Sequence, residues 1–289
     1  TGHKGLVHKK AKFFKLDISN VKEVNKILVK HNIDSIIHLA ANLIISESQK
    51  KPKKYFKNNV TGTKKLLSAS KKTNIKNFIF SSTAAIYKEG QYNVTEKSLI
   101  KPKSVYGKTK IKAEKLIQSF SKKNKLNLGI LRYFNIAGAS LSGKIGLINK
   151  KSDNLFKNFS LEIMKKKPKL KIYGTDYNTK DGTCIRDFIH VSDIAEIHYL
   201  LLEKIDKLNV SKIFNCGYNK GTSVLEVANE FKKQASKRVE IINTKKRDND
   251  LIKIIASNKK LIKFIKWKPK FNKLSKIVKS CIKWEKIIN

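Results

Sequence analysis

The sequence predicts an α/β fold, with a doubly wound parallel sheet that lacks its first βα unit and a second, smaller α/β domain. Apolar runs of strand length alternate with longer segments at helical spacing, which is the pattern of βα units. The alternation loosens after Gly138 into a stretch rich in Gly, Ser, Lys and Asn, and it resumes near Leu170. The chain opens at Thr1 with no methionine and no apolar leader, so we expect a truncated start. These features place the domains at residues 1–136 and 137–289.

The first half contains the strands and helices of an open sheet. Apolar runs predict strands at Phe13–Asp17, Ser35–Leu39, Asn77–Ser82 and Asn127–Asn135. Helical spacing predicts helices at Val21–Lys30, Tyr55–Lys71 and Val105–Lys123. The last helix has the clearest pattern, because its apolar residues recur at i, i+3, i+4 and i+7, at Ala113, Leu116, Ile117 and Phe120.

The second half repeats the alternation on a smaller scale. Strands are expected at Leu170–Tyr173 and Lys212–Cys216, and helices are expected to begin at Ser192 and Ser223. The lysine-rich segments near the end of the chain keep a helical period and are therefore expected to be ordered.

The positive charge of the chain raises the question of a nucleic-acid-binding protein. The formal net charge is +42, yet only four of the 64 basic residues are arginine. Surfaces that read bases or clamp phosphates favour the planar, bidentate guanidinium and interleave it with aromatic residues. Lysine is instead spread along the whole chain, so we predict no nucleic-acid partner and expect the positive field to attract an anionic substrate.

Cysteines, histidines and apolar runs exclude several other classes. The three cysteines, Cys184, Cys216 and Cys281, show no CxxC spacing, which argues against a disulfide framework and against a thiolate metal site. No histidines stand at metal-ligand spacing with a third ligand. No apolar stretch approaches the roughly 20 residues that cross a bilayer. We therefore expect no metal, no membrane association and a cytoplasmic protein.

The glycine pattern bears directly on dinucleotide binding. A dinucleotide fold needs glycines in its first βα turn, where the pyrophosphate approaches the backbone and the helix N-terminus. No GxxGxxG or GxGxxG occurs in the chain. A missing leading piece of roughly 30 residues explains this absence together with the unusual start.

Two residues at the start of the third predicted helix form a candidate catalytic pair. Tyr106 and Lys110 stand at i and i+4 and share one helix face, where an ammonium can lower the pKa of a phenol and leave a general base. Thr83 ends a hydroxyl-rich strand 23 residues earlier, at the sheet edge where open α/β sheets bind ligands. The three side chains are therefore expected to converge.

Several motifs resemble the extended branch of the short-chain dehydrogenase/reductase superfamily, and within it the UDP-glucose 4-epimerase family. The resemblance runs essentially from end to end. It rests on the stretches HLAA (38–41), YFKNNVTG (55–62), FSSTAAIY (80–87), Tyr106–Lys110, LRYFNIAG (131–138) and YGTDYNTKDGTCIRDFIHV (173–191). It implies a Rossmann-like domain that binds NAD, a nucleotide-sugar-binding domain, and an isomerase that interconverts UDP-galactose and UDP-glucose through a transient 4-keto sugar.

The resemblance also implies a role for each matching residue. It makes Tyr106 the base, Lys110 its electrostatic partner and nicotinamide-ribose ligand, and Thr83 the hydroxyl that binds the sugar O4. Other cofactor contacts are implied for Asp17, Ile18, Leu39, Ala40, Ala41, Asn58, Ser81 and Phe134. Substrate contacts are implied for Asn135, Asn154, Leu155, Lys171, Ile172, Tyr173, Arg186, Arg247 and Asp250. Members of this family commonly form dimers, so a homodimer is expected.

Rival functions differ in what they require. A sugar-nucleotide 4,6-dehydratase needs an extra acid and base after the hydroxyl, and here Ala84 and Ala85 follow Thr83. An epimerase for N-acetylhexosamine or uronic acid sugars differs only in pocket size and a few polar contacts, and it stays open as an alternative. A catalytically inactive truncated remnant is the other alternative, favoured by the missing glycine turn and opposed by the intact Thr83, Tyr106 and Lys110.

Overall fold

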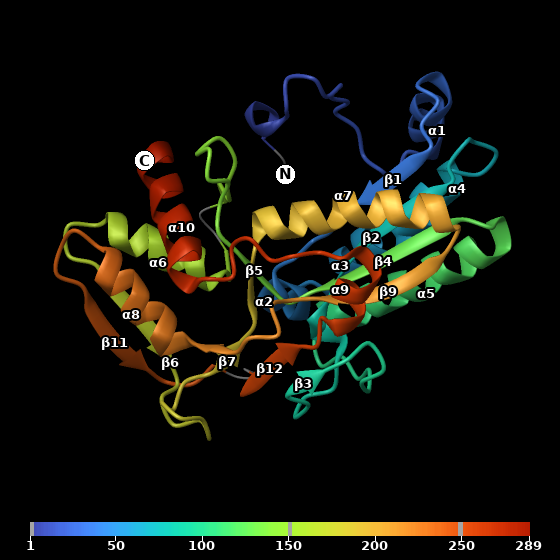
Figure 1. The fold of residues 1–289 in the computed structure, drawn as a ribbon. Helices are drawn as coiled ribbons and strands as arrows, with labels where there is room; N and C mark the ends of the chain where they lie inside the picture. Colours follow the sequence, from blue (N-terminus) through green and yellow to red (C-terminus); the bar gives the residue numbers. More distant parts are fainter. Residues whose placement is uncertain (1–2, 150–151, 248–250) are drawn as a thin grey trace. The chain divides into compact units, whose positions relative to one another are not determined.

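The structure is a computed structural model that describes residues 3–149, 152–247 and 251–289 (Figure 1). The chain divides into two compact units. The first comprises Thr1–Ser82, Ser104–Ile130 and Leu202–Lys212, and the second comprises Thr83–Lys103, Leu131–Leu201 and Ile213–Asn289. Both units are built from α-helices and β-strands, which confirms the predicted α/β class.

The first unit is organised around a sheet. Strands β1 (Ser35–His38), β2 (Asn77–Thr83), β4 (Asn127–Tyr133) and β9 (Ser211–Cys216) form a four-stranded sheet in the order β1-β2-β4-β9. β1 pairs with β2 in parallel, with Ser35 opposite Asn77 and His38 opposite Phe80. Residues of β2 are buried on both faces as far as Ser82, as expected for an inner strand of a parallel sheet.

Helices and short turns come before and between these strands along the chain. They are α1 (Val21–Lys30), α2 (Ile45–Lys50), α3 (Pro52–Tyr55), α4 (Gly62–Ala69), α5 (Val105–Asn124) and α7 (Val191–Leu208), with short 3-10 turns η1 (Lys4–Leu6) and η3 (Ala84–Ile86). Side chains at the N-caps define where helices begin. Asn20 accepts from the backbone N–H of Glu23 at the start of α1, and Ser104 accepts from Gly107 at the start of α5. α1 has the predicted bounds, and α5 ends one residue beyond them.

Three predicted elements differ from the structure. Phe13–Asp17 is not a strand, because no described strand lies beside it to complete a hydrogen-bonded ladder. The segment Tyr55–Lys71 is helical but passes through a π-helical stretch, η2 (Phe56–Thr61), before α4. The predicted strand Asn127–Asn135 is two strands, because β5 (Asn135–Ala137) leaves the main sheet to pair with β8 (Phe188–His190).

The second unit contains small sheets instead of one large one. Among the described residues, they join β5 with β8, β6 (Lys169–Tyr173) with β11 (Glu240–Thr244), and β10 (Thr222–Ser223), β7 (Ile185–Arg186), β12 (Lys253–Ala256) and β3 (Asn93–Val94) in that order. Its helices are α6 (Leu155–Met164), α8 (Val224–Gln234), α9 (Lys259–Ile265) and α10 (Leu274–Ile288). Ser223 and Glu226 form a capping box that begins α8.

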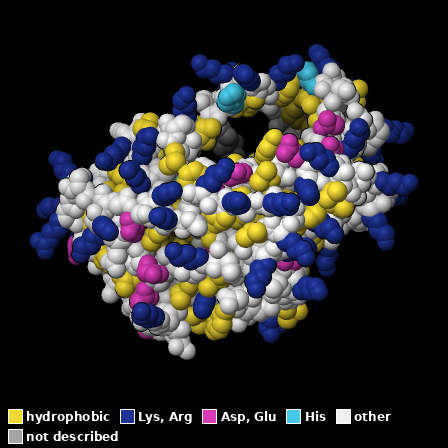
Figure 2. Space-filling view, in the orientation of Figure 1, with side chains coloured by type: hydrophobic (Ala, Val, Ile, Leu, Met, Phe, Trp, Pro, Cys, Tyr) yellow, Lys and Arg dark blue, Asp and Glu magenta, His cyan; other side chains and the backbone are white. Residues whose placement is uncertain are grey.

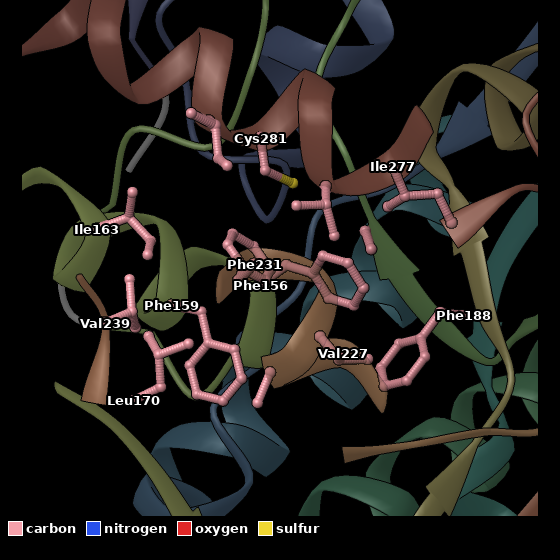
Figure 3. Close-up of a cluster of buried hydrophobic side chains, with 14 of the residues drawn as sticks. Phe156, Phe159, Ile163, Leu170, Phe188, Val227, Phe231, Val239, Ile277 and Cys281 are labelled. Carbon is pink, nitrogen blue, oxygen red and sulfur yellow. The ribbon is translucent and has the colours of Figure 1, made fainter. Parts of the chain in front are cut away.

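The core of the second unit lies among α6, α8, α10 and strand β6. The Phe156 and Phe231 rings pack edge to face with their centroids 5.8 Å apart, and the centroids of the Phe159 and Phe231 rings are 5.6 Å apart. Leu170 from β6 and Ile277 from α10 complete this apolar cluster (Figure 3).

A buried ion pair lies beside this core. Lys157 of α6 donates to Oε1 of Glu285 of α10 at 2.5 Å, and the two side chains are only 2% and 1% exposed. Asn289 donates to the second oxygen, Oε2, at 3.1 Å. Both charges are therefore compensated inside the protein, as buried charges must be.

The surface reflects the lysine-rich composition. On the face shown in Figure 2, lysine and arginine side chains are scattered among apolar and uncharged atoms and form no single patch. Among the residues that the structure describes, no helix is both long and apolar enough to cross a membrane.

Candidate functional site

The two catalytic candidates of the first unit lie on the first turns of α5. Tyr106 is 8% exposed and Lys110 is 2% exposed, and the helix periodicity puts them on one face as predicted. The backbone N–H of Tyr106 donates to Oγ of Ser48 at 3.1 Å, and that of Val105 donates to Gln49 at 3.0 Å. Helix α2 therefore fixes the start of α5, where the candidate base lies.

Lys110 lies in an apolar environment. Its Nζ is 4.3 Å from the centroid of the Phe80 ring, close enough for a cation–π interaction. Burial lowers the pKa of Lys110 to about 7, and the negative charge of Glu114 opposes this effect. The ammonium donates no hydrogen bond to any described residue, so it can offer its protons to a hydroxyl of a bound cofactor ribose.

Asn59, which the sequence did not single out, organises the segment that follows β1. Its side chain accepts from the backbone N–H of Asn42 at 2.8 Å and donates to the carbonyl of the same residue at 3.1 Å. It also donates to Thr109, next to Lys110, at 3.1 Å. The Asn59 amide therefore links the turn after β1 to α5. The three residues are far apart in the sequence, so only the folded structure shows this link.

The other predicted cofactor residues of the first unit are placed as follows. Ser81 is buried and donates to the backbone carbonyl of His38 at 3.1 Å, whereas Leu39 is 58% exposed. Asp17 is exposed, and hydrogen bonds from Ser19 lower the pKa of its carboxyl. The remaining ones lie partly or fully exposed at the surface of this unit, at Ile18, Ala40, Ala41 and Asn58.

Thr83 and Phe134 belong to the second unit and are described with it. Oγ1 of Thr83 accepts from the N–H of Ala85 at 3.2 Å, so the hydroxyl caps the turn η3. Phe134 is buried, and its N–H donates to the carbonyl of Cys216 at 3.1 Å. The predicted meeting of Thr83 with Tyr106 and Lys110 therefore stays a prediction.

Arg132 has a structural role in the same unit. It is 2% exposed and donates from Nη1 to the Tyr87 hydroxyl at 3.1 Å and to the carbonyl of Glu96 at 3.2 Å. The Tyr87 hydroxyl in turn donates to Oδ1 of Asn215 at 2.5 Å. This buried network orders the segment that follows Thr83.

A cavity of about 160 Å³ in the second unit gathers most of the predicted substrate residues. They line it from five parts of the chain: Asn135, Asn154, Leu155, Lys171, Tyr173, Arg186 and Arg247. The side chain of Ile172 belongs instead to the core cluster, because alternate residues of β6 face opposite ways. Asp250 lies outside the described residues. The lining also includes Cys184, Phe188 and Val224, which the sequence did not identify as site residues.

The cavity is suited to an anion with an aromatic or planar part. Arg247 lies over the Tyr173 ring at 3.8 Å, and Arg186 and Lys171 add two more positive charges. Asn154 caps α6 by accepting from the N–H of Lys157 at 3.1 Å, which places the positive end of that helix dipole at the cavity. These groups favour a diphosphate beside a nucleobase.

Asp187 is a buried carboxylate that lies between the cavity residues Arg186 and Phe188 in the chain, and the sequence did not identify it either. Its carboxylate accepts from the N–H groups of Tyr218 at 2.8 Å, Asn219 at 3.0 Å and Ala256 at 3.1 Å. Its backbone carbonyl accepts from Asn135 at 3.0 Å. Burial raises the pKa of this carboxyl to about 6, although the donated hydrogen bonds oppose the shift. Asp187 thus fixes the strand that carries Arg186.

No group of three or more His, Cys, Asp or Glu residues is positioned to hold a metal ion within the described part of the chain. The hydrogen-bond donors around the Tyr106–Lys110 pair and around the cavity are instead lysine, arginine, amide and hydroxyl groups. Such a set suits organic anions and sugar hydroxyls.

Comparisons with known proteins agree with this geometry. The model of the NAD dependent epimerase/dehydratase family matches residues 1–217. The UDP-glucose 4-epimerase of Lactobacillus helveticus is 37% identical over 287 residues, covering 99% of this chain and 87% of the relative.

Solved structures give the same result. The UDP-glucose 4-epimerase of Bifidobacterium longum, crystallised with NAD+ and UDP, superimposes with a TM-score of 0.89 at 30% identity, over 96% of this chain and 84% of that one. The UDP-Glc/GlcNAc 4-epimerase of Campylobacter jejuni gives a TM-score of 0.83 at 37% identity, over 96% and 85% of the two chains. The family match, relatives that align with nearly the whole of this chain, and the shared Rossmann-like fold together show that this chain belongs to the NAD dependent epimerase/dehydratase family.

Proposed function

We propose that the protein is a UDP-glucose 4-epimerase that interconverts UDP-galactose and UDP-glucose. The observation that carries the proposal is the buried Tyr106–Lys110 pair on one face of α5. Relatives with this name align with nearly the full length of this chain. The second unit supports it independently, because its cationic cavity suits a uridine diphosphate.

In this mechanism Tyr106 removes the proton from the sugar O4, and Lys110 lowers the free energy of the resulting phenolate through its positive charge. Thr83 donates a hydrogen bond to O4, and Arg186 and Arg247 hold the diphosphate while the 4-keto sugar turns over. Bound NAD supplies the hydride chemistry at C4. The residues that would hold it are Asp17, Ile18, Leu39, Ala40, Ala41, Asn58, Ser81, Tyr106, Lys110 and Phe134.

The Lys110 ammonium is buried beside Phe80 and donates no hydrogen bond to any described residue. This supports a hydroxyl of the cofactor ribose as its hydrogen-bond partner. We assign NAD binding to residues 1–136 and binding of the nucleotide sugar to residues 137–289, including Asp250. We further propose a cytoplasmic homodimer. Sedimentation at micromolar concentration tests the assembly, and a monomer there would exclude the dimer.

The activity test is the conversion of UDP-galactose to UDP-glucose with added NAD+. Tyr106→Phe should reduce kcat by about 10²–10⁴-fold, because it removes the general base. Tyr92→Phe is the matched control, since Tyr92 is 49% exposed and lies outside the site, and it should keep full activity. Equal activity of the two variants would show that Tyr106 is not the base.

The alternative is an epimerase for N-acetylhexosamine or uronic acid sugars. The Campylobacter jejuni neighbour supports it, because that protein is a UDP-Glc/GlcNAc 4-epimerase. Turnover of UDP-N-acetylglucosamine or UDP-glucuronate without turnover of UDP-galactose would favour this alternative. UDP binding without any turnover would favour an inactive remnant.

A further inference from the structure

Two consecutive basic residues that follow β11 stack on two tyrosines, one at the end of β6 and one in the loop after it. The guanidinium carbon Cζ of Arg247 is 3.8 Å from the centroid of the Tyr173 ring. Nζ of Lys246 is 4.7 Å from the centroid of the Tyr177 ring. Both distances are within the range of a cation–π interaction. Neighbouring residues of one segment are thus attached to two residues of the other segment.

Lys246 has further contacts with the loop after β6. Its Nζ forms an ion pair with Oδ2 of Asp176 at 2.9 Å and donates to the backbone carbonyl of the same residue at 3.4 Å. Its methylene chain lies against Gly174, where φ is +79° and an added Cβ would be 2.7 Å from Cγ of the lysine. The ion pair alone is weak, because its two side chains are 43% and 72% exposed. Together with the ring contact, these interactions hold Lys246 both at Cγ and at Nζ.

The loop at 174–183 is itself held in place. It is closed by a hydrogen bond from the N–H of Tyr177 to the carbonyl of Gly182 at 2.9 Å. The carboxylate of Asp181 accepts from the hydroxyl of Ser223, the N-cap residue of α8, at 2.5 Å. The loop is therefore tied to a helix of the same unit, and the lysine is attached to a segment whose own position is fixed.

Arg247 has few restraints of its own. Its side chain is exposed, and its guanidinium donates no hydrogen bond to any described residue, so its donors are available to a phosphate. An exposed arginine loses rotamer freedom when it binds a ligand. A segment that already directs the side chain toward its target lowers this cost, which strengthens binding. The contacts of Lys246, the residue directly before it, anchor this segment.

We propose that Lys246 is a positioning residue that anchors the segment after β11 on the loop at 174–183 and so holds the Arg247 guanidinium over Tyr173, where it binds the diphosphate of the ligand. The identity of that ligand rests on the proposed epimerase function. Arg247 and Tyr173 line the cavity of the second unit, and Lys246 does not. The effect of the lysine on binding therefore passes through the arginine.

The position of Arg247 can be measured without a ligand. The chain contains only four arginines, so ¹³C labels at arginine Cδ give a simple NMR spectrum, and Arg247→Lys identifies the signal of Arg247. The ring current of Tyr173 shifts protons that lie over its face upfield. Lys246→Met keeps an unbranched apolar side chain but removes the charge, and it should move the Arg247 signal toward the position of an exposed arginine. An unchanged signal would overturn the proposal.

The control for charge is Lys245→Met, which removes the same charge one residue earlier. Lys245 is exposed and does not line the cavity, so this variant should leave the Arg247 signal in place. An equal movement of the signal in both variants would mean that net charge, and not the contacts of Lys246, sets the position of Arg247.

Calorimetric titration with UDP gives a second readout. Lys246→Met should weaken UDP binding about threefold or more, and Lys245→Met should weaken it less. Asp176→Ala separates positioning from simple charge attraction, because it makes the protein more positive. Charge attraction alone predicts tighter binding of the anionic ligand by this variant. Positioning predicts weaker binding, since the lysine loses its ion-pair partner, and tighter binding would overturn the proposal.

A double variant tests whether the lysine acts through the arginine. In an Arg247→Met background, Lys246→Met should change UDP affinity little further, because the group that it positions is gone. The same loss in both backgrounds would show that Lys246 acts independently of Arg247 and would contradict the proposal. If the unsubstituted protein does not bind UDP, the proposed function fails, while the NMR signal of Arg247 still decides the role of Lys246.

Discussion

Replacing Lys157 by methionine tests whether the ion pair between Lys157 of α6 and Glu285 of α10 is shielded from water. The substitution leaves Glu285, which is 1% exposed, with only the Asn289 amide at 3.1 Å as a described partner for its carboxylate. Removing one member of a buried pair typically costs about 3–5 kcal/mol, because the other charge stays in a medium that solvates it poorly. The hydrogen bond from Asn289 partly compensates the charge of Glu285, so we expect a cost below the upper limit of this range.

The assay is urea unfolding followed by tryptophan fluorescence, since Trp284 lies next to Glu285 on α10. Lys157→Met should lower the free energy of unfolding by about 3–4 kcal/mol. The double variant Lys157→Met with Glu285→Leu should recover most of this loss, because two apolar side chains need no compensation. A loss below about 1 kcal/mol in the single variant would show that water reaches Glu285, and the reasoning from burial would fail.

Three more predictions follow. Arg247→Lys should weaken UDP binding about tenfold in calorimetry. Lysine cannot stack on the Tyr173 ring, which the guanidinium approaches at 3.8 Å, and it cannot form two parallel hydrogen bonds to a phosphate. An unchanged affinity would mean that Arg247 does not bind the diphosphate. Gly138→Ala should lower stability by about 2 kcal/mol or more in thermal unfolding, since φ is +87° and a Cβ would lie 2.4 Å from His190; a neutral result would mean that the ring can move away. Stability should fall as the pH drops from 6.5 toward 3, because unfolded His38 binds a proton that the folded ring, with its pKa lowered to about 3, refuses. His38→Gln should weaken this pH dependence in urea titrations, and an identical dependence would place its origin in other residues.

The sequence was sufficient for elements whose signals are local. α1 begins and ends where its periodicity predicts, with Asn20 as its N-cap, and Tyr106 and Lys110 share a helix face because four residues make about one turn. Phe13–Asp17 has the apolar pattern of a strand. A strand also needs a neighbouring strand for its hydrogen bonds, and the sequence of one segment does not show whether such a neighbour is present.

The supporting residues of the site were harder to find. Asn59 and Asp187 act through hydrogen bonds that join segments distant in the sequence. A buried amide or carboxylate has no periodic signature, and in the sequence it resembles a surface residue. The motifs identified the groups that are predicted to contact ligands, and the fold was needed to show what holds those groups in place.

The dispersed lysines have a consequence for the behaviour of the protein in concentrated solution. A net charge of +42 makes separate molecules repel each other at low ionic strength. Salt screens that repulsion over distances beyond about 8–10 Å, so physiological salt removes much of the protection. The lysine-rich surface therefore acts as a colloidal stabiliser, and light scattering should rise with salt before any loss of helical signal.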